Sequence, residues 1–222
     1  MSYTQISSRK RPKQERSTAL VTAILDAAGQ VLHKEGARRF TTARVAQRAG
    51  VSVGSVYQYF PNKAAILFRL QVDEWQKTTD VLCSILDDCE HPPHDRLRSL
   101  VRAFIRSECE EAAVRAALND AAPSYRAAAE ANGVRVSYDD TLKVFMRAAL
   151  PGASDATRGR AADLILTTLC ALGKDFSNKP HAPAEIETYA DSLAEMFSAY
   201  LDRLSHSERF GQCSTASSPS KT

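Results

Sequence analysis

Residues 40–63 read FTTARVAQRAGVSVGSVYQYFPNK, and this stretch decides the fold. Thr41 is a good N-cap for a helix predicted over 42–49, because its side-chain oxygen can accept a hydrogen bond from a free amide of the first turn. Gly50 follows at the point where the chain leaves that helix in a left-handed conformation. The stretch therefore begins with a short helix and a tight turn.

The second half of the stretch repeats this pattern. Ser52 caps a helix predicted over 53–59, which ends before Pro61 because the residue before a proline avoids helical angles. A helix, a three-residue turn with glycine and a second helix are typical of the DNA-binding helix-turn-helix. Only Val56 and Phe60 are expected to point firmly inward. The side chains expected on the surface can all form hydrogen bonds: Ser52, Ser55, Tyr57, Gln58 and Tyr59.

Charge is distributed unevenly along the 222 residues. Residues 1–63 hold 11 Lys/Arg against 3 Asp/Glu, whereas the remainder holds 18 against 23. A basic module on an acidic body favours a polyanion partner at one end only. Residues 1–16 are interpreted as an arm that contacts phosphates or enters the minor groove, with a solvated tail as the alternative. The candidate contacts of this arm are Arg9, Lys10, Arg11 and Arg16.

Composition and motifs exclude several classes of protein. Hydrophobic residues make up 44% of the chain, enough for a sizeable core, but no apolar run approaches the length of a membrane span. No apolar signal-peptide core follows the basic N-terminus, so the expected compartment is the cytoplasm. The histidines are scattered, and no P-loop, GxSxG or dinucleotide fingerprint appears. We therefore expect no enzyme, no metal site and no cofactor.

The five cysteines show no CxxC spacing. We interpret them as reduced and mostly structural. A thiol sensor is the alternative, although no flanking pattern favours a reactive thiolate.

The rest of the chain is helical in pattern, and no segment alternates with period two over enough residues to predict a strand. The expected fold is all-α with about nine helices. Outside the helix-turn-helix, the expected helices cover 17–35, 63–86, 96–110, 112–121, 124–150, 157–176 and 184–204. The expected organisation is a basic arm over 1–16, a helix-turn-helix domain over 17–62, a helical ligand-binding and dimerisation domain over 63–204, and a disordered tail over 205–222.

Residues 17–67 resemble the DNA-binding domain of TetR/AcrR-type transcriptional regulators. The motif that carries the resemblance runs from Thr41 to Lys63 and reads T-T-x-x-V-A-x-x-A-G-V-S-x-G-S-V-Y-x-Y-F-x-N-K. The remaining two thirds of the chain match only in length, helical content and order. The resemblance implies an all-α homodimer that binds a pseudo-palindromic operator and releases it when a small molecule binds the C-terminal domain. It also implies a repressor, with an activator of the same fold left open.

The resemblance also implies which residues contact DNA. The matching positions are Thr42, Ser52, Val53, Gly54, Ser55, Tyr57, Gln58, Tyr59 and Lys63, and we add Arg44 as a further candidate. Gln58 is the candidate base reader, because its amide can pair with adenine through two hydrogen bonds. Gly54 allows close approach of the duplex, and both tyrosine hydroxyls can reach phosphate oxygens.

Two further sites are expected in the body. A cavity for an apolar or aromatic effector would be lined by Trp75, Thr79, Cys83, Phe104, Tyr125, Tyr138, Phe145 and Met146, with ordinary core packing as the alternative for each. A dimer interface on the last two helices would use Ile165, Leu169, Leu172, Phe176, Tyr189, Leu193, Phe197, Tyr200 and Leu204. The alternative is that these helices are interior helices of a monomer. Gly173, with alanines nearby, suits close helix approach.

Overall fold

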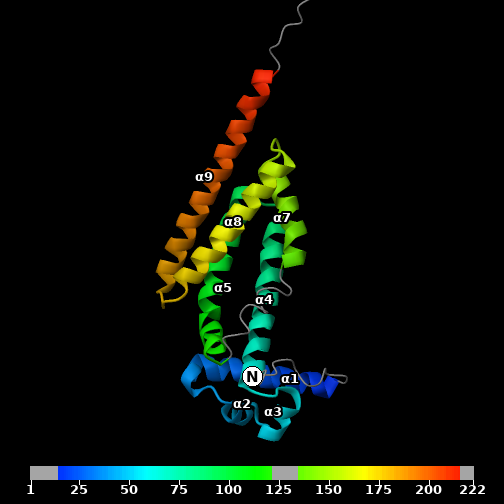
Figure 1. Cartoon of the computed structure of the whole chain (residues 1–222), viewed down its shortest axis with the longest axis vertical. Helices are drawn as coiled ribbons and strands as arrows, with labels where there is room; N and C mark the ends of the chain where they lie inside the picture. Colours follow the sequence, from blue (N-terminus) through cyan, green and yellow to red (C-terminus); the bar gives the residue numbers. More distant parts are fainter. Residues whose placement is uncertain (1–14, 122–134, 216–222) are drawn as a thin grey trace, which may run out of the picture. The chain divides into compact units, whose positions relative to one another are not determined.

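The computed structural model describes the backbone of residues 15–121 and 135–215, and the side chains of residues 17–121 and 140–206. Over these ranges the chain is built from helices, and no strand is formed. The chain divides into an N-terminal unit, Met1–Lys77 with Glu110–Gly133, and a C-terminal unit, Thr78–Cys109 with Val134–Thr222. The helices α4 and α5 contribute residues to both units (Figure 1).

The N-terminal unit contains the helix-turn-helix (Figure 1). Its first elements are α1 (Glu15–Glu35), the short 3-10 helix η1 (Ala37–Arg39), α2 (Thr42–Ala49) and α3 (Val53–Tyr59). The predicted caps are confirmed: Thr41 Oγ1 accepts from the Arg44 amide at 3.3 Å, and Ser52 Oγ accepts from the Ser55 amide at 3.0 Å. Gly50 has φ 68°, the left-handed conformation in which glycine carries no steric penalty.

The core of the N-terminal unit forms where the apolar stripes of its helices meet. Val45 and Val56 are fully buried, and Phe60 is 1% exposed. They pack with the buried apolar residues of α1. The end of α5 joins this core through Ala117 and Leu118, together with Ala65, Ile66, Leu67 and Leu70 of α4.

The two long helices differ from the prediction in one respect. Helix α4 (Lys63–Asp87) begins after Asn62, whose side-chain Oδ1 accepts from the Ala65 amide at 2.9 Å. Helix α5 (Pro93–Ala121) is continuous, although the sequence predicts two helices with a break near residue 111. Glu111 interrupts the apolar pattern there, but its side chain is 4% exposed and accepts a hydrogen bond from Gln71 Nε2 at 2.9 Å. A buried carboxylate with a partner, rather than a turn, explains the interruption.

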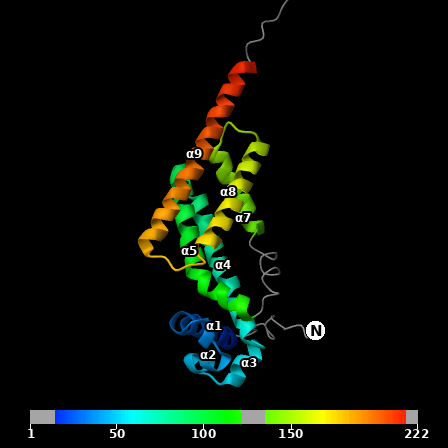
Figure 2. The same ribbon diagram turned by 60° about the vertical axis from the view of Figure 1, so that its left-hand side comes forward.

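The C-terminal unit adds α7 (Arg135–Ala149), α8 (Asp155–Phe176) and α9 (Pro183–Thr215) to the ends of α4 and α5 that belong to it (Figures 1 and 2). Ser154 caps α8, because its Oγ accepts from the Thr157 amide at 3.1 Å. Helix α9 continues to Thr215, so the tail expected to be disordered from Ser205 is helical as far as that residue. Of the helices described, none is both long and apolar enough for a membrane span.

The apolar stripes of α8 and α9 face the core of their own chain. Four residues predicted at a dimer interface are at most 6% exposed in the single chain: Ile165, Leu169, Leu193 and Phe197. The other five, Leu172, Phe176, Tyr189, Tyr200 and Leu204, are partly buried and pack against the same cluster. For Ile165, Leu169, Leu193 and Phe197 the prediction is wrong, because these side chains leave almost no surface for a second subunit.

Gly173 marks a close approach between α8 and α5. A Cβ atom at this position would lie 2.9 Å from Phe104 Cε1 and 3.3 Å from Ile105 Cδ1. The close approach that the sequence suggested for Gly173 is therefore made within the chain.

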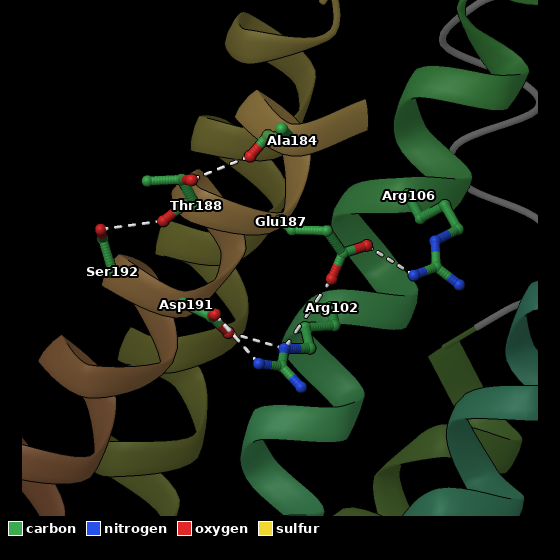
Figure 3. Close-up of polar contacts among 7 residues, drawn as sticks. All are labelled: Arg102, Arg106, Ala184, Glu187, Thr188, Asp191 and Ser192. Carbon is green, nitrogen blue, oxygen red and sulfur yellow. Dashed lines mark hydrogen bonds and ion pairs between the residues drawn. The ribbon is translucent and has the colours of Figure 1, made fainter. Parts of the chain in front are cut away.

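A network of ion pairs joins α9 to α5 (Figure 3). Arg102 donates to Asp191 through Nε at 2.6 Å and through Nη2 at 2.9 Å, and Arg106 Nη2 lies 2.5 Å from Glu187 Oε1. The hydrogen bond from Arg102 lowers the pKa of the Asp191 carboxyl, and the same bond raises the pKa of Arg102. Paired charges of this kind fix the register of α9 against α5.

Candidate nucleic-acid interface

Helix α3 has one buried face and one exposed face. Val56 points into the core, while Val53 is 39% exposed and Tyr57 is 44% exposed. Ser52, Gly54 and Gln58 are also exposed, and Ser55 is half-buried. The hydroxyls of Ser52 and Ser55 lie 2.8 Å apart, so both are oriented at the start of the helix. This exposed surface of α3, from Ser52 to Gln58, is called the recognition face below.

Tyr59 does not belong to the recognition face. The sequence predicts that it is exposed, but its side chain is 9% exposed and its hydroxyl lies 3.1 Å from Ser17 Oγ in α1. This prediction is wrong because the bonding partner lies 42 residues earlier in the chain, where the local pattern of α3 carries no signal. Ser17 is a positioning residue that the sequence did not reveal, since its hydrogen bond fixes the end of α3 against α1.

Two arginines of α2 are held by α1. Arg44, a predicted DNA contact, is exposed but forms an ion pair with Glu35. Arg48 Nε donates to Gln30 Oε1 at 2.7 Å. Thr42, another predicted contact, is 8% exposed, so little of its surface is available to a phosphate. These contacts hold the side chains of the two arginines against α1.

Exposed cations lie in the elements that precede and follow the helix-turn-helix. Lys63 is exposed at the first position of α4, where the amide end of the helix also favours an anion. Arg38 and Arg39 are exposed in η1. The predicted contacts Arg9, Lys10 and Arg11, and the side chain of Arg16, lie outside the described residues. Chemically, this arrangement offers hydrogen-bond donors and acceptors with positive charge nearby, as nucleic-acid recognition requires.

Comparison with known families decides what the helix-turn-helix belongs to. Residues 24–70 match the family model described as bacterial regulatory proteins of the tetR family, and residues 92–204 match the tetracyclin repressor-like C-terminal domain. The chain belongs to the TetR family of transcriptional regulators. Its helix-turn-helix is therefore the DNA-binding part of a transcription regulator, and the family assignment indicates a non-enzymatic protein.

A curated protein is similar to this TetR-family chain over part of its length. Nucleoid occlusion factor SlmA from Haemophilus influenzae is 36% identical over 70 residues, which cover 31% of this chain and 30% of that protein. The chain thus matches less than a third of the length of its curated relative.

Solved structures show the same fold. A TetR-family regulator from Mesorhizobium loti superposes with a TM-score of 0.61 at 19% identity and covers 84% of this chain and 98% of that one. The fatty acid degradation regulator FadR from Bacillus halodurans gives a TM-score of 0.55 at 18% identity, over 85% of this chain and 97% of that one.

The predicted effector-site residues that the structure describes are divided between the two units of this TetR-family chain. Thr79 is buried, and Phe145 and Met146 are each 1% exposed within the C-terminal core. Cys83 and Phe104 pack against the same core, whereas Trp75 is half-buried and belongs to the N-terminal unit. The side chains of Tyr125 and Tyr138 lie outside the described residues. Trp75 and the other described candidates therefore belong to different units, and the cavity stays a prediction.

Cysteines and acidic groups of this TetR-family chain form no covalent or metal cluster in the described part. Cys83, Cys89, Cys109 and Cys170 are thiols rather than disulfides, and Cys89 and Cys170 are exposed. Among the described residues, no three or more His, Cys, Asp or Glu side chains are grouped as metal ligands would be.

Proposed function

We propose that the protein is a ligand-responsive repressor that binds a pseudo-palindromic operator as a homodimer. Helix α3 of each subunit would lie in the major groove, and a small molecule in the C-terminal domain would release the DNA. The compartment that fits this role is the cytoplasm. The observation that carries the proposal is the recognition face: a short capped helix presents hydrogen-bonding side chains to solvent and buries only Val56 and Tyr59.

Side chains on the recognition face support specific roles at the duplex. Gln58 is exposed and carries the amide that pairs with adenine. Tyr57 is exposed, so its hydroxyl is available to a phosphate, while Lys63 supplies a charge at the start of α4. A Cβ atom at Gly54 would meet only Ser52 Oγ, at an ordinary contact distance of 3.7 Å. Internal packing therefore does not require a glycine at this position, which supports the proposed close approach of the duplex.

Exposed apolar side chains support a dimer through α8 and α9. Leu164 of α8 is 51% exposed and Met196 of α9 is 47% exposed, although both helices bury their other stripes. Large apolar side chains on the outward faces of two long helices are suited to a partner. These outward residues, rather than the four buried ones, are the proposed centre of the interface.

A gel-shift titration tests the proposal most simply. The probe is the DNA upstream of the protein's own gene, and the titration is repeated at rising salt. A regulator with several phosphate contacts should lose affinity steeply as salt rises, with a linear dependence of log K on log salt. Absence of a shifted band on this DNA and on a library of genomic promoters would contradict the proposal.

Transcription from the bound promoter separates a repressor from an activator. With purified polymerase, the repressor proposal expects less transcript as the protein is added and recovery when an effector is present. An increase in transcript would instead identify an activator. The thiol-sensing alternative expects operator release on oxidation and recovery on reduction, and neither response is expected here.

A further inference from the structure

Arg96 is a buried cation without a counter-ion among the described residues. It lies in the first turn of α5, its side chain is 5% exposed, and it forms no ion pair with a described residue. Taking a guanidinium out of water is costly unless a carboxylate and further hydrogen bonds offset the lost hydration. The burial of Arg96 therefore requires an explanation.

The contacts of Arg96 use one edge of the guanidinium. Nη1 donates to the carbonyl oxygen of Leu86, in the last turn of α4, at 2.7 Å. The guanidinium carbon lies 5.3 Å from the centre of the Phe145 ring. A helix C-terminus and an aromatic face both attract a cation, but neither carries a full negative charge.

The other edge of the guanidinium has no partner among the described residues. Arg96 Nε is buried and has no hydrogen-bond partner, the only such side-chain atom in the described part of the chain. Nε and Nη2 lie on the side of the guanidinium opposite to Nη1. Their parallel N–H groups form the fork that binds a carboxylate through two hydrogen bonds.

Arg158 shows what an arginine looks like when it only caps a helix. Its Nε donates to the Leu150 carbonyl at 3.0 Å, its Nη2 donates to the Pro151 carbonyl at 2.9 Å, and its Nη1 contacts Asp155 at 2.9 Å. All three nitrogens are used at the end of α7, and a carboxylate balances the charge. Helix capping and the pair with Asp155 therefore explain the contacts of all three nitrogens of Arg158, whereas capping explains the contact of only one nitrogen of Arg96.

The surroundings of Arg96 indicate the class of ligand. Phe145, under the guanidinium, belongs to an apolar cluster that includes Leu82, Leu97, Leu100 and Met146. One guanidinium edge matches a monoanion with two oxygens, and the amide end of α5 adds a favourable dipole. Residues 89–92, which connect α4 to α5 and precede Arg96 by about one helical turn, are exposed.

We propose that the free edge of Arg96 anchors the carboxylate of the effector, a small organic acid with an apolar acyl or aryl body. This deepens the proposed function and rests on it, because it assumes that a small molecule controls operator binding. The carboxylate would bind beside the last turn of α4. That helix begins at Lys63, next to the recognition face, so a shift of α4 would reach the DNA contact.

The test uses matched acids and amides on the full chain. The probes are octanoate with octanamide, and 4-phenylbutyrate with 4-phenylbutyramide, each titrated by calorimetry. The wild type should bind at least one acid and prefer it to its amide. Arg96→Met should weaken acid binding by about 10- to 100-fold, the cost of losing hydrogen bonds to a charged group. Arg98→Met, which removes an exposed arginine of the same helix, should leave binding unchanged.

Three results would overturn the proposal. They are equal binding of acid and amide by the wild type, an unchanged preference in Arg96→Met, and no binding of either acid at millimolar concentration. If Arg96→Met does not fold, the test uses the NMR spectrum of the wild type instead. The Nε–H signal of Arg96 is assigned as the signal that is missing from the spectrum of Arg96→Lys. That signal should shift with the acid and not with the amide, and a signal unmoved by a bound acid overturns the proposal.

Gel shifts on the same samples separate the two proposals. A protein that binds its operator but neither acid contradicts the Arg96 proposal alone. A protein that binds no operator contradicts the proposed function, whatever the acids do.

Discussion

Tyr57 and Tyr59 lie two residues apart in α3 and are predicted alike from the sequence, yet they differ in the folded chain. Tyr57 is 44% exposed, whereas Tyr59 is 9% exposed and its hydroxyl lies 3.1 Å from Ser17 Oγ. A helix of seven residues is too short for its own periodicity to sort every side chain. The assignment of Tyr59 depends on a partner in another helix, which no local pattern contains.

Removing the two hydroxyls separately tests this difference. Tyr57→Phe should weaken operator binding by about 1 kcal/mol and leave the free energy of unfolding unchanged, because the hydroxyl contacts only the partner. Tyr59→Phe should lower the free energy of unfolding by about 1 kcal/mol, because the bond to Ser17 is lost. Operator titration and urea unfolding measure the two effects. The reverse pattern would place Tyr57 in the fold and Tyr59 on the DNA.

Lys63 gives a prediction about salt dependence. If its ammonium neutralises one phosphate, Lys63→Ala should weaken operator binding and make the slope of log K against log salt shallower by about 0.9. Lys143→Ala is the control, because Lys143 is an exposed lysine of the C-terminal unit paired with Asp140. An unchanged slope in Lys63→Ala would show that Lys63 contacts no phosphate.

At the scale of the helix, the capping residues at the ends predict the helix bounds better than the apolar pattern between them does. The bounds of α2 and α3 follow from Thr41, Gly50 and Ser52, whose roles are local and can be read directly. The continuity of α5 could not be read in this way. Glu111 looks like an interruption in sequence, and only its contact with Gln71, 40 residues earlier, makes it part of a continuous helix.

Two glycines of α8 give opposite predictions. A Cβ at Gly173 would lie 2.9 Å from Phe104 Cε1, so Gly173→Ala should lower the free energy of unfolding by about 1–3 kcal/mol through overpacking. A Cβ at Gly159 would meet no described neighbour within 4 Å. Gly159→Ala should therefore raise the free energy of unfolding by up to about 1 kcal/mol, because alanine has the higher helix propensity. Thermal and urea unfolding of both variants provide the measurement. Equal effects of the two substitutions would contradict the close contact between α8 and α5.

The pairing of α9 with α5 predicts a dependence on pH. The hydrogen bond from Arg102 lowers the pKa of Asp191 in the folded chain, so the pair stabilises the fold above the unfolded pKa and loses that effect as pH falls through the lower, folded pKa. Asp191→Asn should therefore be less stable than the wild type at pH 7, with the difference shrinking as pH falls below about 4. Urea unfolding at several pH values measures this. A difference that stays constant with pH would contradict an ionic role for Asp191.

At the scale of the whole chain, the sequence predicts the all-α class and the family. It does not predict which apolar residues lie in the core and which lie on the surface. Ile165 and Leu169 recur with helical spacing, and such a stripe looks the same whether it faces a second subunit or the chain's own core. Their burial assigns them to the core, and the exposed Leu164 is the better candidate for a subunit contact. The predicted effector site shares this ambiguity, because aromatic residues in a stripe do not reveal whether a cavity separates them.

An exposed dimer face makes a prediction for the assembly. Leu164→Glu together with Met196→Glu should convert the dimer to a monomer, because each places a charge on a surface that the proposed interface would bury. Light scattering during gel filtration measures the mass, and circular dichroism checks that the helices remain. A dimer that persists in the double variant would show that subunits associate elsewhere.

The recognition face of α3 is proposed to select particular DNA sequences. Selection of bound fragments from sheared genomic DNA by the purified wild type and by Gln58→Ala, followed by sequencing, tests this proposal. We predict that the wild type enriches a small set of fragments sharing an inverted repeat, and that Gln58→Ala loses this enrichment while remaining folded. Uniform recovery of genomic DNA by the wild type, or the same enriched set from Gln58→Ala, would contradict it.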